Sequence, residues 1–182
     1  SQTPVILFLI ASMFHEELNE ENWKYSKSQI YKKFFDWTAK SGGLIQNGEN
    51  VKHKVPDNYR EILQEVACEI FSHPDAKSGM LHYEVLLKQL SQKFDGIDLK
   101  KSLNEKIFVA HAFKESVPEH IEFIHQSLRE YLVVEKIFNL YYKFLDVNKP
   151  FTAKELDLTL SILTQPITIA KLNFFKDMIF SI

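Results

Sequence analysis

"EFIHQSLREYLVVEKIF", residues 122–138, contains the change from a strand-like to a helix-like pattern on which the fold prediction rests. Upstream of His125, two aromatic or apolar runs, "KIFVAHAF" and "HIEFIH", flank the turn-like "KESVPE", and this order predicts an antiparallel hairpin. From Gln126 to about Leu145, apolar residues recur every three or four positions, which predicts a helix with a narrow polar stripe. A helix this apolar has to be covered on most of its sides.

Helical spacing of apolar residues extends over most of the remaining chain. The clearest stripe ends before Pro74 and consists of Tyr59, Ile62, Leu63, Val66, Ala67, Ile70 and Phe71. Further helices are expected at about residues 4–15, 28–40, 82–94 and 98–104, with a loop over 44–58. "TAKE" at Thr152–Glu155 forms a capping box that opens another helix, and Pro166 begins the last one. We therefore expect a mainly α protein with a small β element.

The order of elements from residue 59 to 125, three helices followed by a hairpin, is that of a winged helix. We expect a small helical domain at 1–50, a winged-helix domain with its long closing helix at 51–146, and the start of a following helical region at 147–182. A winged-helix DNA-binding domain is one functional interpretation. It is disfavoured because the expected third helix has mixed charge in "DLKKSLNEK" and the wing "KESVPEH" leans negative.

The composition limits the partners and the compartment. The 182 residues include 22 Lys and Arg against 24 Asp and Glu, so the chain lacks the basic excess of proteins held mainly by phosphate contacts. Cys68 is the only cysteine, which excludes an internal disulfide and favours a reducing, cytoplasmic location. The most hydrophobic run, Val5–Phe14, is too short for a membrane helix. The chain starts at a helix cap and stops in the apolar "DMIFSI", and we expect it to be a piece of a larger protein.

The residues that carry chemistry do not form a recognisable catalytic motif. No glycine-rich phosphate loop is present, so the chain by itself is not expected to be an enzyme. His111, His120 and His125 would approach one another on the hairpin, but ordinary surface and core histidines are favoured over a metal site. His125, Ser127 and Glu130 are the residue types of a hydrolytic triad, yet they crowd one junction, and Ser127 is better interpreted as the cap of the following helix.

His125 has a second interpretation, because it is expected at the end of a strand and just before a helix. A histidine can donate a hydrogen bond to a phosphate oxygen, and the N–H groups at a helix start favour an anion in the same place. The alternative is a structural histidine bonded to a carbonyl group.

The same stretch resembles the signature that closes the winged-helix domain of NACHT-type STAND NTPases, which include the NOD-like receptors and many bacterial relatives. The positions that agree with this signature are Phe123, His125, Ser127, Glu130 and Tyr131. Leu128 stands where an aromatic residue is usual, and Val133-Val134 replace the common pair of alanines. "TPVILFLIASMF", residues 3–14, resembles the proline-led helix that opens the small helical domain after the nucleotide-binding core.

The resemblance implies a non-catalytic regulatory module of a signalling ATPase of innate immunity or phage defence. In that family ADP or ATP, with Mg, is held between an upstream phosphate-loop domain and these two appended domains, which control switching and self-oligomerisation. By resemblance, Pro4 would pack near the base or ribose and His125 would reach the β-phosphate. A helical interaction scaffold that never contacts nucleotide is the other alternative, besides DNA binding.

Overall fold

The computed structural model describes residues 25–41, 45–46, 49–50, 58–76, 79–94, 113–114, 119–145, 152–153, 155–157 and 169–179. The helix expected from Pro4, the short helix expected near 98–104 and the start of the last helix at Pro166 lie outside these residues. The described part is mainly helical, as expected from the apolar spacing.

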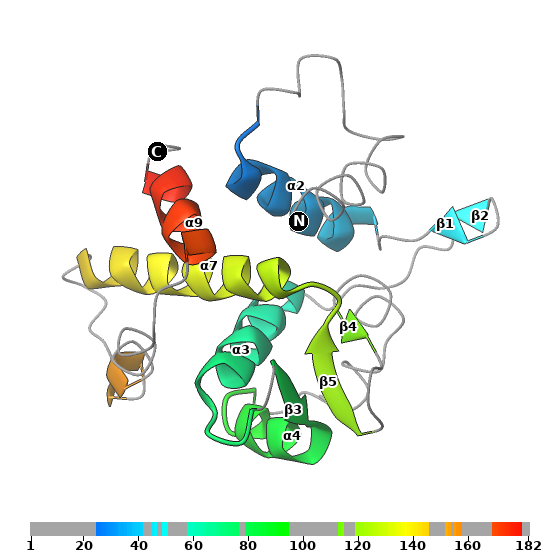
Figure 1. Ribbon diagram of the computed structural model, residues 1–182, viewed down its shortest axis with the longest axis vertical. Coiled ribbons are helices and arrows are strands. Elements are labelled where there is room, and N and C mark those ends of the chain that lie inside the picture. Colours follow the sequence, from blue (N-terminus) through cyan, green and yellow to red (C-terminus); the bar gives the residue numbers. More distant parts are fainter. Residues whose placement is uncertain are drawn as a thin grey trace.

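Five helices organise the described part of the chain. They are α2 (Lys27–Ser41), α3 (Tyr59–Ser72), α4 (Tyr83–Ser91), α7 (Gln126–Leu145) and α9 (Ile169–Ile179). Helix α7 crosses the middle of the molecule, with α2 and α9 on one side and α3 and α4 on the other (Figure 1). The long helix expected from Gln126 to Leu145 is therefore confirmed, together with its coverage by other elements.

A three-stranded antiparallel sheet lies beside α3 and α4 (Figure 1). Strand β5 (His120–Phe123) lies between β3 (Met80–His82) and β4 (Phe113–Lys114), with Leu81 opposite Ile121 and Phe113 opposite Phe123. The hairpin predicted upstream of His125 is confirmed as β4 and β5. Strand β3 was not predicted, and α4 accordingly begins at Tyr83.

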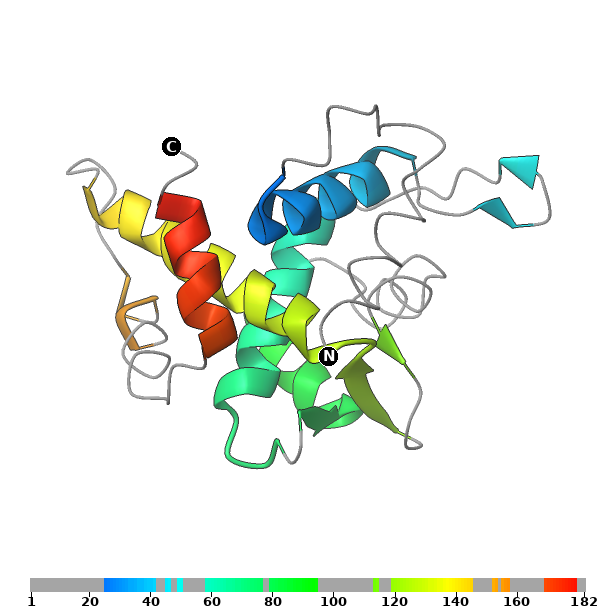
Figure 2. The same ribbon diagram turned by 45° about the horizontal axis from the view of Figure 1, so that its top comes forward.

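A second, two-stranded sheet consists of β1 (Ile45–Gln46) and β2 (Glu49–Asn50), which pair antiparallel. It projects from the side of the molecule in both ribbon views (Figures 1 and 2). The expectation of a plain loop over 44–58 is wrong at these four residues. The intervening Asn47-Gly48 is a sequence typical of a two-residue hairpin turn.

The core is built on α3 and the first half of α7. All but one of the residues in the predicted stripe of α3 are buried, and Phe71 is partly buried. On α7, the buried residues run almost without interruption from Ser127 to Val134 because α2, α3, α9 and β5 all contact this helix. Since burying a large apolar side chain contributes about 1.5–3 kcal/mol, these two helices supply much of the driving force for folding.

Three aromatic rings join α2, α7 and α9. The ring of Tyr31 stacks on Tyr131 at 5.4 Å and meets Phe174 edge-on at 5.3 Å, and all three side chains are buried. Figure 2 shows the three helices converging. This aromatic cluster belongs to the same hydrophobic core as α3 and α4, so buried contacts cross the domain boundary expected near residue 50. The division into domains stays a prediction.

An ion pair between Arg60 and Glu135 links α3 to α7 next to this cluster. The Arg60 guanidinium donates to both carboxylate oxygens of Glu135, at 2.7 and 2.5 Å, and Gln64 donates to the same carboxylate at 2.7 Å. The guanidinium also lies over the ring of Phe35 on α2, 4.5 Å from its centre. Burial alone would raise the pKa of Glu135, but the bonds and charge of Arg60 outweigh it and hold that pKa below its usual range.

The capping box predicted at Thr152–Glu155 is confirmed. The Thr152 hydroxyl oxygen accepts from the Glu155 N–H at 3.2 Å, and the Glu155 carboxylate accepts from the Thr152 N–H at 2.9 Å. Lys143 of α7 donates to the same carboxylate at 2.6 Å, which ties this short segment to the end of α7.

Candidate functional site at the start of helix α7

His125 lies at the junction where β5 ends and α7 begins (Figure 1). Its carbonyl oxygen accepts from the Leu128 N–H at 3.1 Å, and its Nδ1 accepts from the Ser127 N–H at 3.1 Å. The first turn of a helix leaves such N–H groups without helical partners. His125 therefore caps α7, and the prediction that Ser127 is the cap is wrong. The Nδ1 atom is as many bonds from the backbone as the Oδ atom of Asn or Asp, which explains how the ring replaces them.

The Ser127 hydroxyl links this cap to α2. Its Oγ lies 2.6 Å from His125 Nδ1 and 2.5 Å from the Tyr31 hydroxyl oxygen. Tyr31 is 0% exposed and Ser127 is 2% exposed, so the pair is sealed from solvent. A continuous chain of polar groups thus runs from Tyr31 through Ser127 to His125.

The tautomer of His125 follows from the backbone bond. An N–H group can only donate, so Nδ1 has to be an acceptor and the ring proton of the neutral side chain is on Nε2. This places a hydrogen-bond donor on a ring that begins a 20-residue helix. The start of a helix carries partial positive charge, and because His125 already engages the Ser127 and Leu128 N–H groups, an anionic oxygen here would be attracted by that charge and by the ring rather than bound by these two amides.

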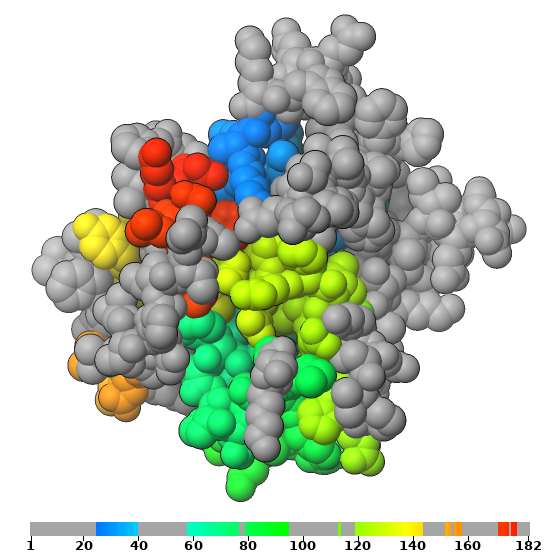
Figure 3. Space-filling model, in the orientation of Figure 1, coloured from blue at the N-terminus to red at the C-terminus, as the bar shows by residue number. Residues whose placement is uncertain are grey.

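Three cations with partly or fully buried side chains feel the charge of Glu130 near the start of α7. Lys27 from α2, Arg129 from α7 and Lys171 from α9 each have a pKa lowered by burial, and the charge of Glu130 opposes that lowering in all three. Glu130 itself is 4% exposed and accepts from the Gln126 amide at 3.0 Å. Lys27 also feels the charge of Asp177, and Arg129 that of Glu122, so cations and carboxylates are mixed in this region. Figure 3 shows the first part of α7 reaching the surface between α9 and α3.

The guanidinium of Arg129 also lies beside Gly79, the residue before β3. Gly79, just before β3, has a φ of +84°, and a Cβ atom there would collide with the Arg129 guanidinium. The positive φ favours glycine at this position, and the guanidinium beside it would have to shift to make room for a side chain.

The arrangement does not favour hydrolytic chemistry at Ser127. His125 Nδ1 does reach Ser127 Oγ, as a base would reach a nucleophile, but the hydroxyl is buried and engaged by Tyr31. A nucleophile has to meet the substrate, and the packing of α2 covers this one. The Glu130 carboxylate makes a contact within α7, where it accepts from the Gln126 side-chain amide.

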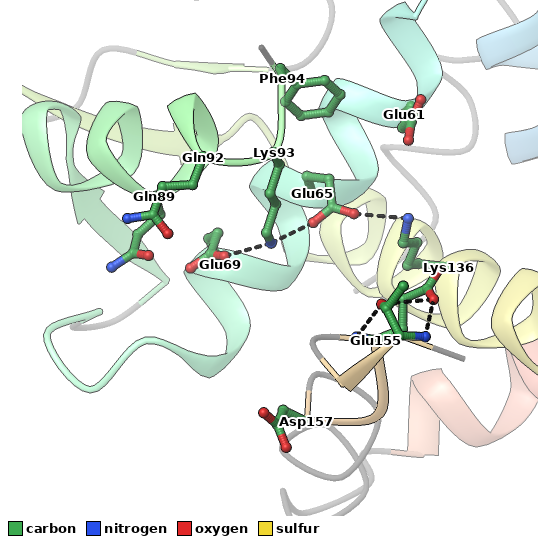
Figure 4. A pocket seen from close by; sticks show the side chains of 11 residues that line it. Glu61, Glu65, Glu69, Gln89, Gln92, Lys93, Phe94, Lys136, Glu155 and Asp157 are labelled. Carbon is green, nitrogen blue, oxygen red and sulfur yellow. Dashed lines mark hydrogen bonds and ion pairs between the residues drawn. The ribbon is translucent and has the colours of Figure 1, made fainter. Parts of the chain in front are cut away.

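A cavity of about 560 Å³ lies on another face, between α3, α4, α7 and the Thr152–Asp157 segment (Figure 4). Its lining includes five carboxylate side chains and two lysines, together with two glutamines, Phe94 and Thr152. The charged residues are Glu61, Glu65, Glu69, Glu155, Asp157, Lys93 and Lys136.

Ion pairs within the cavity neutralise its most buried carboxylate. Glu65 accepts from Lys93 at 2.6 Å and from Lys136 at 2.8 Å, and Lys93 also reaches Glu69 at 2.7 Å (Figure 4). Burial would raise the pKa of Glu65, but the charges and bonds of Lys136 and Lys93 lower it overall. These ion pairs link α3 to α7 and to Lys93, which follows α4. The charged side chains that line the cavity therefore have a structural role.

The histidines meet differently from the prediction. His120 pairs across the sheet with His82, with ring centres 5.2 Å apart, and His82 Nε2 lies 3.3 Å from a carboxylate oxygen of Glu119. His111 lies outside the described residues. Within the described ranges, no group of three His, Cys, Asp or Glu side chains is arranged to hold a metal ion.

Cys68 is fully buried in α3, and burial raises the pKa of its thiol to about 12, so it is a packing residue. Pro4 lies outside the described residues, so its nucleotide contact stays a prediction. Tyr31 was not identified from the sequence, because the helical pattern there indicated only Ile30, Phe34 and Trp37 as a packing face.

The chain matches no protein-family model, and comparison with curated proteins and with solved structures finds no match. Among the helices that the structure describes, none combines the length and the apolar character required to cross a membrane.

Proposed function

We propose that this chain is a regulatory module of a STAND-type signalling NTPase and that His125 contributes a hydrogen bond to the phosphate of bound ADP or ATP. The observation that carries the proposal is the bond from the Ser127 N–H to His125 Nδ1, which leaves the proton on Nε2 and so makes the ring a donor. A nucleotide phosphate presents acceptor oxygens with negative charge. The ring, as a donor, and the partial positive charge at the helix start suit such a group.

The order of elements also supports the proposal. Helix α3, strand β3, helix α4 and the β4–β5 hairpin follow one another as in a winged helix, and the sheet order β3-β5-β4 places the hairpin beside β3. The third helix of such a domain falls at residues outside the description, so the winged helix remains part of the proposal. The stretch that resembles the family signature, Glu122–Phe138, covers β5, the His125 cap and the buried half of α7.

In this proposal the module is not itself catalytic. The phosphate loop, the Mg ion and the chemistry of hydrolysis belong to a nucleotide-binding domain upstream of residue 1 in the intact protein. A nucleotide bound from both sides stabilises a closed state, and its loss permits the module to move away and the protein to self-associate. Losing one hydrogen bond to a charged group, about 1–3 kcal/mol, shifts that equilibrium by roughly 5- to 150-fold.

The intact protein provides the test. His125→Ala is expected to reduce the amount of ADP that copurifies with it and to raise the fraction of oligomer, measured by chromatography of the released nucleotide and by mass photometry. His120→Ala, which removes another histidine of the same strand region, is the matched control and is expected to change neither. Unchanged nucleotide content in the His125 variant, or an intact protein without a phosphate loop, would contradict the proposal.

A further inference from the structure

The buried pair formed by Tyr31 and Ser127 is the longest-range side-chain hydrogen bond at the start of α7. It joins residues 96 positions apart, on α2 and α7, and both side chains are almost completely shielded from water. A buried hydroxyl pair without a structural or functional purpose is costly compared with apolar packing. The rings of Tyr31, Tyr131 and Phe174 already pack α2 against α7 and α9, so the hydroxyl of Tyr31 needs an explanation of its own.

The direction of the hydrogen bonds along this chain can be assigned from one end. His125 Nδ1 accepts from the Ser127 N–H and so carries no proton, which makes the Ser127 hydroxyl the donor in its 2.6 Å contact with Nδ1. Because the serine proton points at the ring, the Tyr31 hydroxyl is the donor and Ser127 Oγ the acceptor in their 2.5 Å contact. Filling the acceptor side of Ser127 in this way directs the serine proton to the ring.

We propose that Tyr31 is a positioning residue for His125. Through Ser127 its hydroxyl adds to the Ser127 N–H bond in holding the imidazole in the Nε2–H tautomer and in one orientation. Helix α2 thereby strengthens the donor form of the ring at the start of α7, and a movement that separates α2 from α7 weakens it. The effect on nucleotide rests on the proposed function, whereas the effect on the tautomer does not.

The tautomer is measured on the 182-residue chain without any nucleotide, by long-range ¹H–¹⁵N correlation of the histidine rings. The wild-type spectrum is expected to show the pyridine-type nitrogen of His125 at Nδ1. Tyr31→Phe keeps the ring stacking and removes only the hydroxyl, and we expect about a fivefold fall in the ratio of Nε2–H to Nδ1–H tautomers, the effect of losing one hydrogen bond. Ser127→Ala is expected to act similarly, and Ser127→Thr, which keeps the hydroxyl, to preserve the wild-type ratio.

Tyr131→Phe is the matched control. This tyrosine belongs to the same aromatic cluster, but its hydroxyl donates to Glu135 at 2.9 Å. Its variant is expected to leave the His125 signals unchanged. Wild-type ¹⁵N shifts in a folded Tyr31→Phe chain, or equal shifts in the Tyr131 control, would overturn the proposal, and Ser127→Ala gives the same decision if Tyr31→Phe does not fold.

A separate measurement distinguishes this inference from the proposed function. In the intact protein, Tyr31→Phe is expected to weaken ADP retention in the same direction as His125→Ala, but less. If His125→Ala has no effect on ADP while Tyr31→Phe still changes the tautomer, the positioning role stands and the nucleotide role fails. If His125→Ala releases ADP and the tautomer does not depend on Tyr31, the nucleotide role stands and the positioning role fails.

Discussion

Two strand-to-helix junctions of this protein use a histidine in the same local way and differ in everything around it. His82 ends β3 and caps α4, with its Nδ1 accepting from the Glu84 N–H at 3.3 Å. His125 follows β5 and caps α7, with its Nδ1 accepting from the Ser127 N–H at 3.1 Å. The first side chain is 38% exposed and its Nε2 meets Glu119, whereas the second is held from the Nδ1 side by the buried Ser127–Tyr31 pair.

In both places the cap itself is a local hydrogen bond within the first turn of the helix. The two rings differ in their tertiary contacts, because only that of His125 is linked through Ser127 to α2. At α4, one ring nitrogen of His82 contacts Glu84 in the first turn of that helix and the other contacts Glu119, just before β5. At α7, the ring is joined to a helix that lies 96 residues earlier in the sequence. A change in the packing of α2 is therefore expected to reach His125 and to leave His82 unaffected.

The largest expected effect comes from Glu135→Ala, which breaks the ion pair that supports Tyr131 and Phe35 between α2, α3 and α7. Arg60 would be left without its carboxylate in a mostly buried place, and removing one partner of such a pair costs about 3–5 kcal/mol. Urea denaturation is expected to show this loss, and the ring signals of His125 are expected to broaden while those of His82 persist.

Glu61→Ala, an exposed glutamate in the first turn of α3, is the control and is expected to change stability by less than about 0.5 kcal/mol. Equal broadening of both histidines in the Glu135 variant would show that the two junctions are not independent.

A smaller effect is expected from removing the Ser127 hydroxyl at the start of α7 and, in a separate variant, the capping histidine at the start of α4. Ser127→Ala leaves the buried Tyr31 hydroxyl without its acceptor and should cost about 1–3 kcal/mol. His82→Ala removes an exposed cap and should cost about 0.5–1 kcal/mol. Thermal and chemical denaturation of the two variants side by side tests this order, and a His82 variant less stable than the Ser127 variant would reverse the comparison.

The smallest effect concerns the capping box at Thr152–Glu155, where the Thr152 hydroxyl takes the place of a capping histidine and the Glu155 carboxylate accepts from the Thr152 N–H. Hydrogen bonds from Lys143 and from the Thr152 N–H lower the pKa of Glu155 to about 2. Because the folded pKa lies below the ordinary value of about 4.3, the stabilisation is fully present above that value and is lost as the pH falls toward 2. Carbon-detected titration of the Glu155 carboxyl is expected to give a midpoint near 2. A midpoint above 4 would contradict the capping box as a stable contact.

Much of the fold was predictable, because helical periodicity and capping residues act over a few positions. The stripe of α3, the length of α7, the β4–β5 hairpin and the Thr152–Glu155 box all depend on such local patterns. Strand β3 escaped prediction because three residues with one buried side chain, Leu81, cannot display an alternation.

The candidate site was predictable only in part. His125 was identified from its place between a strand and a helix, and that place is confirmed. The sequence predicts Ser127 as the cap, because serine is a common cap, whereas in the structure the cap is His125 Nδ1, which lies as far from the backbone as a carboxamide oxygen. Tyr31 could not be found, since nothing local to α2 marks a tyrosine whose hydroxyl partner lies on α7.

The central claim is that the ring of His125, in contrast to that of His82, contributes to nucleotide binding. It is tested most directly by the dissociation rate of a fluorescent ADP analogue from the intact protein. We expect His125→Ala to release the analogue about tenfold faster than wild type, as for the loss of one hydrogen bond to a charged group, and His82→Ala to release it at the wild-type rate. Equal rates for wild type and the His125 variant would contradict the claim.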